Sequence, residues 1–349
     1  MKTILRNLLL AVLILLMQTT AAKAQAFDDA GQYMDHISKA NEKLTAVYLS
    51  YTSALAHKNA RKQEKRRSDV LNAIIDTKAI IMGMPPWKGD RSYKDSTAAY
   101  LKLLNIVFNE DYAKIVNMEE IAEQSYDAME AYLLAQEKAD EKLEEARVRQ
   151  HNGSLSFAKK NNINLIEGES EIGRKSKIVS DLNKHCNDVY LVFFKPYKQE
   201  MYLLDALQKG NLIAIEQNIN SLEKFTKEGE EKLKTFEGFN SDPSLIAACQ
   251  EALVFYQSES TRTKNLSDFF LKKENFDKMK KAFDAKRNND RTKTDIDNFN
   301  NSVNEMNAAS KDYNKLNDQL NKERTAMLNN WNKKYGRYLE EHMPVQRKQ

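Results

Sequence analysis

The chain has 349 residues, 30% of them charged, and only 10 Gly and 5 Pro. So few turn-forming residues favour long helices over a sheet protein rich in turns. The formal net charge of +4 would suggest an anionic partner, but Lys2, Arg6 and Lys23 contribute three of the 54 cations without any acid beside them. Without residues 1–24 the remaining 51 cations face 50 acids, which disfavours nucleic acid as a partner.

The first 24 residues have the three-part order of an export signal. A basic start precedes an apolar run, residues 8–17, and a small-residue stretch, residues 21–24. This order predicts a signal peptide over 1–24, cleaved between Ala24 and Gln25. A membrane anchor is the alternative, but the apolar run would rise only ~15 Å as a helix, about half of the hydrocarbon core. We therefore expect an exported protein with no transmembrane helix in the mature chain.

Apolar residues recur at three- and four-residue spacing in several long segments, which is typical of amphipathic helices. The first predicted helix runs from Asp28 to about His57, and further helices are predicted over 111–150 and 212–236. The last predicted helix, of about 45 residues, follows Asn288–Asp290. Its apolar residues form one seam, which consists of Phe299, Val303, Met306, Tyr313, Leu320, Met327, Trp331 and Tyr338. Seams of this length predict helices packed alongside one another.

Gly- and Pro-containing segments separate the predicted helices. Residues 83–90 include two adjacent prolines, and residues 238–243 end in Asp-Pro, a suitable helix start. We expect the helix over 111–150 to end at His151–Gly153. Because the connections are short, neighbouring helices should be antiparallel.

A weak internal repeat is visible in the sequence. A shift of 149 positions aligns residues 36–108 with residues 185–257 and pairs Gly89 with Gly238. We therefore predict an all-α fold of elongated antiparallel helical bundles, in two tandem four-helix-type repeats. The predicted domains are 25–165 and 166–349, after the signal peptide.

The two cysteines, Cys186 and Cys249, both lie in the exported part of the chain. An oxidising compartment would allow a disulfide between them, and two buried free thiols are the equal alternative. Sequence spacing alone does not decide between the two.

Motifs for catalysis, metals or nucleotides are weak in this sequence, and we expect no enzymatic activity and no cofactor. The stretch Gly168–Ser176 resembles a phosphate-binding loop, but its glutamates oppose phosphate and no strand precedes it. The five histidines are scattered without metal-ligand spacing. His185 and Cys186 are adjacent, so on a helix their side chains point about 100° apart. Trp87 fits the closure of a bundle end better than a ligand site.

One basic cluster is a candidate contact for anionic partners. It consists of Lys58, Arg61, Lys62, Lys65, Arg66 and Arg67, with a single acid among them. Such a cluster can attract lipid headgroups, lipopolysaccharide phosphate or another acidic polymer, and a solvated helix start is the alternative interpretation. No aromatic residues alternate with the cations, which argues against nucleic acid.

Three stretches carry a resemblance to a known group of proteins. They are residues 109–143, with 190–207 and 268–287, and they resemble an uncharacterised family of exported all-helical surface proteins of Gram-negative bacteria. The resemblance implies an envelope location, in the periplasm or on the outer surface, and a helical fold. It assigns no functional residues.

The sequence thus predicts a non-enzymatic structural or interaction protein of the cell envelope. Its partner would be an envelope protein or an anionic polymer or lipid surface. The alternative is a helical bundle that binds a small lipid-like or haem-like ligand in its interior.

Overall fold

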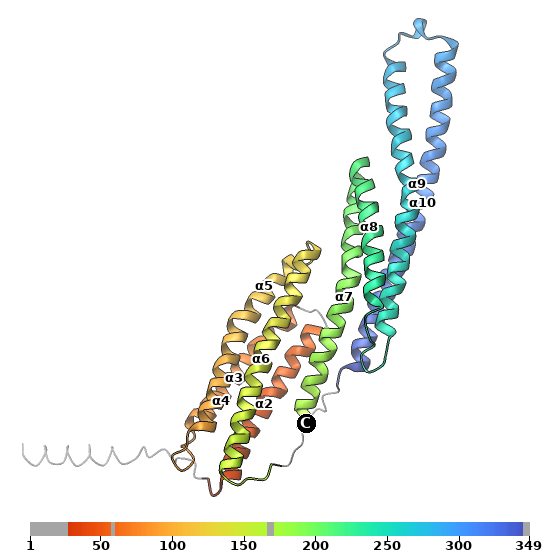
Figure 1. Ribbon diagram of the computed structural model, residues 1–349. Helices are drawn as coiled ribbons and strands as arrows, with labels where there is room; N and C mark the ends of the chain where they lie inside the picture. Colours follow the sequence, from red (N-terminus) through yellow and green to blue (C-terminus); the bar gives the residue numbers. More distant parts are fainter. Residues whose placement is uncertain (1–26, 57–59, 166–170, 345–349) are drawn as a thin grey trace, which may run out of the picture. The chain divides into compact units, whose positions relative to one another are not determined.

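The computed structural model describes residues 27–56, 60–165 and 171–344 (Figure 1). Within these ranges the chain forms α-helices, one π-helical turn, one 3-10 turn and two isolated β-bridges, and no strand. The predicted all-α class is confirmed. The predicted cleavage point between Ala24 and Gln25 lies outside the described residues. In the described ranges, no helix is both long and apolar enough to cross a membrane.

The chain divides into two compact units. One comprises the chain up to Asn117 together with Leu134–Lys177, and the other comprises Met118–Leu133 and the chain from Ile178 onwards. The boundaries fall inside helices, and the segment Met118–Leu133 groups with the second unit. The domains expected from the sequence, 25–165 and 166–349, stay a prediction.

The first unit is built around an aromatic core. Its elements are α2 (Ala30–Ala56), α3 (Ala60–Gly83), α4 (Ser92–Ile106), the π-helical turn η1 (Val107–Asp111) and the larger parts of α5 (Tyr112–Ala122) and α6 (Tyr126–Lys160). Helix α3 packs against both α2 and α4. Phe108, from the π-helical turn, contacts Tyr51 and Tyr112, with ring centroids 5.2 and 4.8 Å away. All three rings are fully buried.

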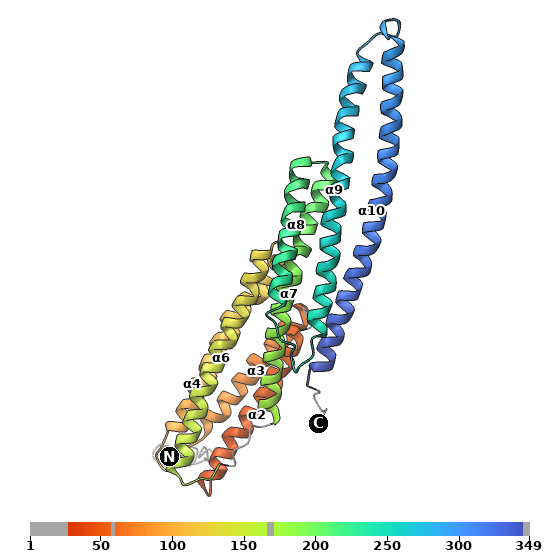
Figure 2. The same ribbon diagram turned by 45° about the vertical axis from the view of Figure 1, so that its right-hand side comes forward.

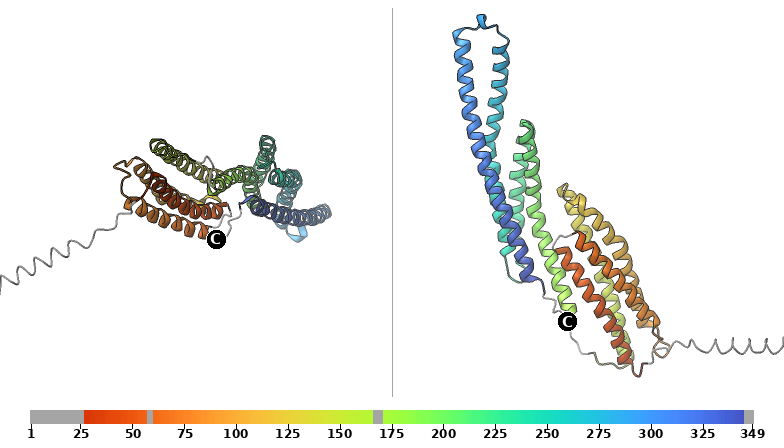
Figure 3. Two further views of the ribbon diagram at one scale, coloured as in Figure 1. Left: turned by 90° about the horizontal axis from the view of Figure 1, so that it is seen from below. Right: turned by 180° about the vertical axis from the view of Figure 1, so that it is seen from behind.

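The second unit contains the longest helices. Its elements are nearly all of α7 (Glu171–Lys209), with α8 (Leu212–Leu233), α9 (Ser244–Asp284), the 3-10 turn η2 (Asn288–Asp290) and α10 (Lys293–His342). Helix α9 packs against both α8 and α10. A Cβ at Gly229 of α8 would lie 3.1 Å from both Val192 and Leu253, so this glycine lets α8 approach α7 and α9 closely. Figures 2 and 3 show α9 and α10 running on together beyond the α7–α8 turn.

The prediction of one continuous helix over 111–150 is wrong. The chain breaks at Glu123–Ser125, between α5 and α6. Ser125 caps the new helix, because its hydroxyl accepts a hydrogen bond of 3.1 Å from the backbone N–H of Ala128. A serine cap satisfies one of the free N–H groups at a helix start, and Asp127 in the first turn adds a favourable charge.

The predicted helix end at His151–Gly153 is also wrong, because α6 continues to Lys160. Gly153 serves close packing. A Cβ at this position would lie 2.3 Å from the hydroxyl oxygen of Ser96 on α4, so the serine side chain would have to shift. The sequence suggested a helix-ending glycine, and the structure shows a contact between two helices instead.

Two tight turns with isolated β-bridges have the same geometry in the two units. Trp87 bridges to Asp90 before α4, and Phe239 bridges to Asp242 before α9. Each turn has two central residues with positive φ, namely Lys88 (47°) and Gly89 (82°) in one and Asn240 (51°) and Ser241 (64°) in the other. The aspartates also act alike, since each accepts a hydrogen bond from the backbone N–H two residues later.

The two turns are 152 residues apart, three more than the shift found in the sequence. The longer shift also pairs buried positions of α3 with buried positions of α8, which are Gln63 with Ile215, Val70 with Leu222, Ile74 with Thr226, Thr77 with Gly229 and Ile81 with Leu233. Three residues are close to one helical turn, so both shifts match apolar faces. The tandem repeat stays a prediction, which these correspondences favour.

Candidate functional site

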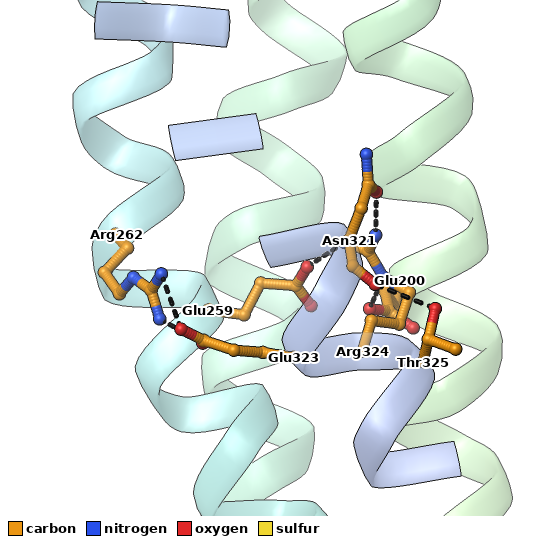
Figure 4. Close-up of polar contacts among 7 residues, drawn as sticks. All are labelled: Glu200, Glu259, Arg262, Asn321, Glu323, Arg324 and Thr325. Atoms are coloured by element: carbon orange, nitrogen blue, oxygen red, sulfur yellow. Dashed lines mark hydrogen bonds and ion pairs between the residues drawn. The ribbon is translucent and has the colours of Figure 1, made fainter. Parts of the chain in front are cut away.

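A buried ion cluster joins three helices of the second unit (Figure 4). Arg324 on α10 donates from Nε to a carboxyl oxygen of Glu200 on α7 and from Nη2 to one of Glu259 on α9. Its Nη1 donates to the side-chain oxygen of Asn321, one turn earlier on α10. The side chains of Glu200 and Glu259 are 2% and 1% exposed, and that of Arg324 is 12% exposed.

The cluster holds two carboxyl groups against one guanidinium. Burial, and then the neighbouring Glu259, raise the pKa of Glu200 well above its ordinary value, against the opposing effect of Arg324. Two carboxylates side by side in a low-dielectric interior cannot both ionise at low cost. At neutral pH Glu200 therefore keeps its proton.

Two polar atoms beside the cluster have no hydrogen-bond partner among the described residues. They are Oε2 of Glu259 and the hydroxyl of Tyr256, both fully buried. Burial and the two glutamates raise the pKa of Tyr256, so its phenol stays protonated and can donate.

A second, solvent-facing ion pair lies next to the buried cluster. Arg262 on α9 donates from both Nη atoms to the carboxylate of Glu323 on α10. Gln319 also donates to Glu323, at 3.1 Å. The hydrogen bond from Arg262 lowers the pKa of Glu323. Together the two arginine pairs connect α10 to α7 and α9 on successive residues, 323 and 324.

The projecting part of α9 and α10 is the largest exposed feature of the second unit. We call residues 271–312 the distal hairpin. It starts directly beyond Phe270, whose ring lies 3.3 Å from the position of a Cβ on Gly210 at the α7–α8 turn. Within the distal hairpin Ser302 is the single buried residue. Leu271, Met279 and Ile296 are 49%, 40% and 43% exposed.

The two helices of the distal hairpin are held together by stacked aromatic rings. Phe283 stacks on Phe299 with ring centroids 4.2 Å apart, and the guanidinium of Arg291 covers the other side of Phe283 at 4.2 Å. At the base, the rings of Phe269 and Tyr313 are 4.4 Å apart. These rings are half-buried, because no third helix covers the seam between α9 and α10.

The structure places most of the predicted basic cluster on the first two turns of α3. Lys58 lies outside the described residues. Arg61, Lys62 and Lys65 are exposed, whereas Arg66 pairs with Asp69 at 3.1 Å.

Arg67 turns inward and does not join the exposed cations. Its Nε and Nη2 donate to Glu64 at 2.8 and 2.7 Å, and its Nη1 donates to the carbonyl oxygen of Phe108 at 2.8 Å. It therefore links α3 to the π-helical turn η1. The anionic contact itself stays a prediction.

Cys186 and Cys249 are both buried and both free thiols in the structure. They lie on α7 and α9, and Sγ of Cys249 contacts the carbonyl oxygen of Val189, one turn from Cys186, at 3.8 Å. Burial raises the pKa of the Cys249 thiol. The disulfide is not formed here and stays a prediction for the exported protein.

The remaining sequence candidates lie in separate places. His185 packs beside Phe239 and Tyr338, and burial lowers its pKa. Trp87 donates from its indole N–H to Asn161 at 2.9 Å and contacts Tyr33 with ring centroids 5.9 Å apart. The first residues of the phosphate-loop-like stretch lie outside the described ranges, and α7 begins at Glu171. Among the described residues no three His, Cys, Asp or Glu side chains form a metal-binding group.

Sequence reasoning missed the buried ion cluster, although a signal was present. Glu200, Glu259 and Arg324 each occupy an apolar-stripe position of their helix. Glu200 follows Phe193 by two turns, and Arg324 follows Leu320 by one turn. A charged residue in register with buried apolar ones indicates a buried pair.

Comparison of the chain with protein-family models, with curated proteins and with solved structures finds no match. The resemblance to exported helical surface proteins stays a prediction.

Proposed function

We propose that the chain is a non-enzymatic structural or interaction protein of the cell envelope, and that it acts by contact through the distal hairpin. The observation that carries this proposal is that the side chains of the hairpin are so little buried. Its 42 residues bury a single side chain, that of Ser302, while three large apolar side chains are more than a third exposed.

An isolated pair of helices gains little from such packing. Short helices are marginal in water, and tertiary burial of an apolar face supplies most of their stability. Here the rings in the seam between α9 and α10 stay half-buried. A partner that covers the exposed apolar side chains would supply the missing burial.

The rest of the second unit is suited to hold the hairpin in place. Arg324 ties α10 to α7 and α9 deep in the bundle, and Trp331 stacks on Phe193 of α7 with ring centroids 4.2 Å apart. On the bundle side of the contact between Phe269 and Tyr313, α10 is therefore anchored to two other helices. The hairpin is the free end of a well-anchored helix pair, an arrangement suited to contact.

A shortened chain tests the proposal. Residues 272–311 are replaced by a short Gly-Ser loop, which leaves Phe270 and Tyr313 to close the bundle. The original and the shortened chains are produced in a Gram-negative host with the natural signal, and their neighbours in the envelope are captured by chemical crosslinking. We expect the shortened chain to keep its helical circular dichroism per residue and its thermal midpoint within a few degrees, and to lose the captured neighbours.

A matched variant controls for nonspecific changes of the surface. Lys43→Glu, Lys78→Glu and Lys102→Glu alter three exposed lysines of the first unit that make no ion pair among the described residues. This variant should capture the same neighbours as the original chain. Unchanged capture by a folded shortened chain would refute the role of the hairpin.

A further inference from the structure

The two β-bridged turns are held by matching sets of side chains in the two units. In the first unit, Tyr33 of α2 lies against Trp87 of the turn and Phe157 of α6, with ring centroids 5.9 and 5.5 Å away. Lys160 of α6 pairs with Asp90 of the turn at 2.9 Å. A ring from α2, a ring from α6 and a cation from α6 therefore hold this turn.

The second unit has the same arrangement with different residues. His185 of α7 lies against Phe239 of the turn and Tyr338 of α10, with ring centroids 6.3 and 6.0 Å away. Nε2 of His342 on α10 lies 2.8 Å from the carboxylate of Asp242 in the turn. We call these five residues the His185 cluster. It has histidines at the two places where the first unit has a tyrosine and a lysine.

Sequence spacing and burial both support this correspondence. His185 follows Tyr33 by 152 positions, the same separation as between the two turns. Each side chain ends in a buried polar atom without a hydrogen-bond partner among the described residues, namely the hydroxyl of Tyr33 and Nε2 of His185. Burial raises the pKa of Tyr33, so its ring stays neutral. His36, one turn further along α2, lies against Phe27 with ring centroids 5.5 Å apart.

The titratable groups around His185 come from three elements. Asp188 on α7 and Asp242 in the turn favour its charged form, and His342 on α10 opposes it. Tyr338 stays neutral, because burial raises its pKa, and its hydroxyl donates to the carbonyl oxygen of Asp242 at 3.3 Å. Burial has the largest effect and lowers the pKa of His185 below its ordinary value of 6.5.

A proton on His185 is costly while the cluster is closed. The neutral imidazole has one N–H group and one bare nitrogen, whereas the charged ring has two N–H groups. The group at Nε2 would then be buried without an acceptor among the described residues. On the exposed side of α10, Arg337 and Glu341 pair with each other at 2.7 Å. Water reaches the charged ring only when the turn and the end of α10 move away.

We propose that the His185 cluster is an acid-responsive contact, in which a proton taken up by His185 separates the 239–242 turn and the last turn of α10 from α7. This inference concerns the bundle of the second unit and does not depend on the role of the distal hairpin. Below pH 6.5 the open form binds more protons than the closed form. The opening equilibrium therefore rises as pH falls, by at most tenfold per pH unit, until the lowered pKa is reached. Among unperturbed side chains only histidine changes its charge between pH 5 and 8, so the turn of the first unit stays closed.

Hydrogen exchange of the mature chain, residues 25–349, measures the opening. It is followed by mass spectrometry at pH 7.5 and pH 5.0, with the rates corrected for the intrinsic effect of pH on unprotected amides. We expect peptides that cover 236–248 and 334–343 to exchange about fivefold faster or more at pH 5.0 after this correction. Peptides that cover 84–96 and 152–161 belong to the turn of the first unit, and their corrected rates should change by less than about twofold.

Exchanged residues between the two units supply the decisive variants. His185→Tyr places in the second unit the side chain that the first unit has there, and it should reduce the effect of pH to less than about twofold. His185→Phe, a second neutral variant without a polar atom, should do the same. Tyr33→His is the reciprocal change and should make the 84–96 peptide exchange faster at pH 5.0. His342→Lys keeps a cation beside Asp242, so this variant should stay as acid-responsive as the original chain.

Three outcomes would overturn the inference. One is an original chain whose 236–248 peptide has equal corrected rates at both pH values. Another is an effect of pH that persists in His185→Tyr and His185→Phe, because a different group would then take up the proton. The third is an effect that disappears in His342→Lys while that variant stays folded by circular dichroism, which would assign the response to His342.

Discussion

Arg324 of α10 donates a hydrogen bond from Nε to the carboxyl group of Glu200 on α7, and both side chains lie inside the second bundle. The same guanidinium reaches Glu259 on α9. A single arginine therefore connects three helices inside the bundle from which the distal hairpin projects. Buried ion pairs add little net stability by themselves, but removal of one partner leaves an uncompensated charge.

We predict that Arg324→Met destabilises the second unit strongly. Methionine fills a similar volume without a charge, so the buried carboxyl groups of Glu200 and Glu259 would lose both their cation and the hydrogen bonds that it donates. The expected loss is about 3–5 kcal/mol in the free energy of unfolding, measured with urea. Arg262→Met breaks the neighbouring, solvent-facing pair with Glu323 and should cost less than about 1 kcal/mol. Equal losses for the two variants would contradict the buried position of Arg324.

Glu200→Gln should stabilise the protein above pH 5, by an amount that grows with pH. The pKa of Glu200 is raised in the folded chain, so between its ordinary value, near 4.5, and the raised value the folded state binds more protons than the unfolded state. Stability from this group is therefore lost as pH rises, by at most about 1.4 kcal/mol per pH unit. Glutamine cannot ionise, so the variant avoids this loss.

The measurement is the difference in unfolding free energy between Glu200→Gln and the original chain at several pH values from 5 to 8. Glu251→Gln is the matched control on α9. The hydrogen bond from Lys334 lowers the pKa of Glu251, so this group is ionised in both states throughout that range. A flat difference for Glu200→Gln would show that Glu200 is ionised in the folded protein.

Much of the helical layout could be predicted from periodicity. The expected segments 28–57 and 212–236 correspond to α2 and α8, and the long last helix is α10. Local signals were misread where packing decides the outcome. Gly153 ends no helix; it lies inside α6, where its backbone approaches Ser96 of α4 closely.

Charge was harder to interpret than apolar spacing. Arg67 looked like one cation in a basic cluster, and only the folding of α3 beside the π-helical turn shows that it binds the carbonyl oxygen of Phe108. Glu200 and Arg324 lie 124 positions apart in the sequence. No local pattern links them, and their apolar-stripe positions become informative only when considered together.

The equivalence of the two β-bridged turns predicts opposite effects on stability for two substitutions. Ser241 has φ of +64°, and Gly89 occupies the equivalent place with φ of +82°. Glycine adopts positive φ without the steric cost that other residues bear. Ser241→Gly should therefore raise the unfolding free energy by about 0.5–1 kcal/mol, and Gly89→Ser should lower it by a similar amount. Thermal unfolding followed by circular dichroism checks both, and a destabilised Ser241→Gly would show that the two turns are not equivalent.

The basic cluster yields a prediction that separates contact from stability. Reversal of Arg61, Lys62 and Lys65 to Glu changes exposed side chains near the start of α3, where acidic residues suit the helix dipole. This variant should keep its unfolding free energy within about 0.5 kcal/mol. It should lose binding to vesicles with anionic headgroups, and binding by the original chain should weaken as salt rises. Arg67→Glu removes the hydrogen bond to Phe108 and places a second glutamate beside Glu64, so it should lower the free energy of unfolding by about 2 kcal/mol. As long as this variant is folded, it should bind the vesicles as the original chain does. If the triple variant binds vesicles as well as the original chain does, the cluster is a solvated helix start and the anionic contact lies elsewhere.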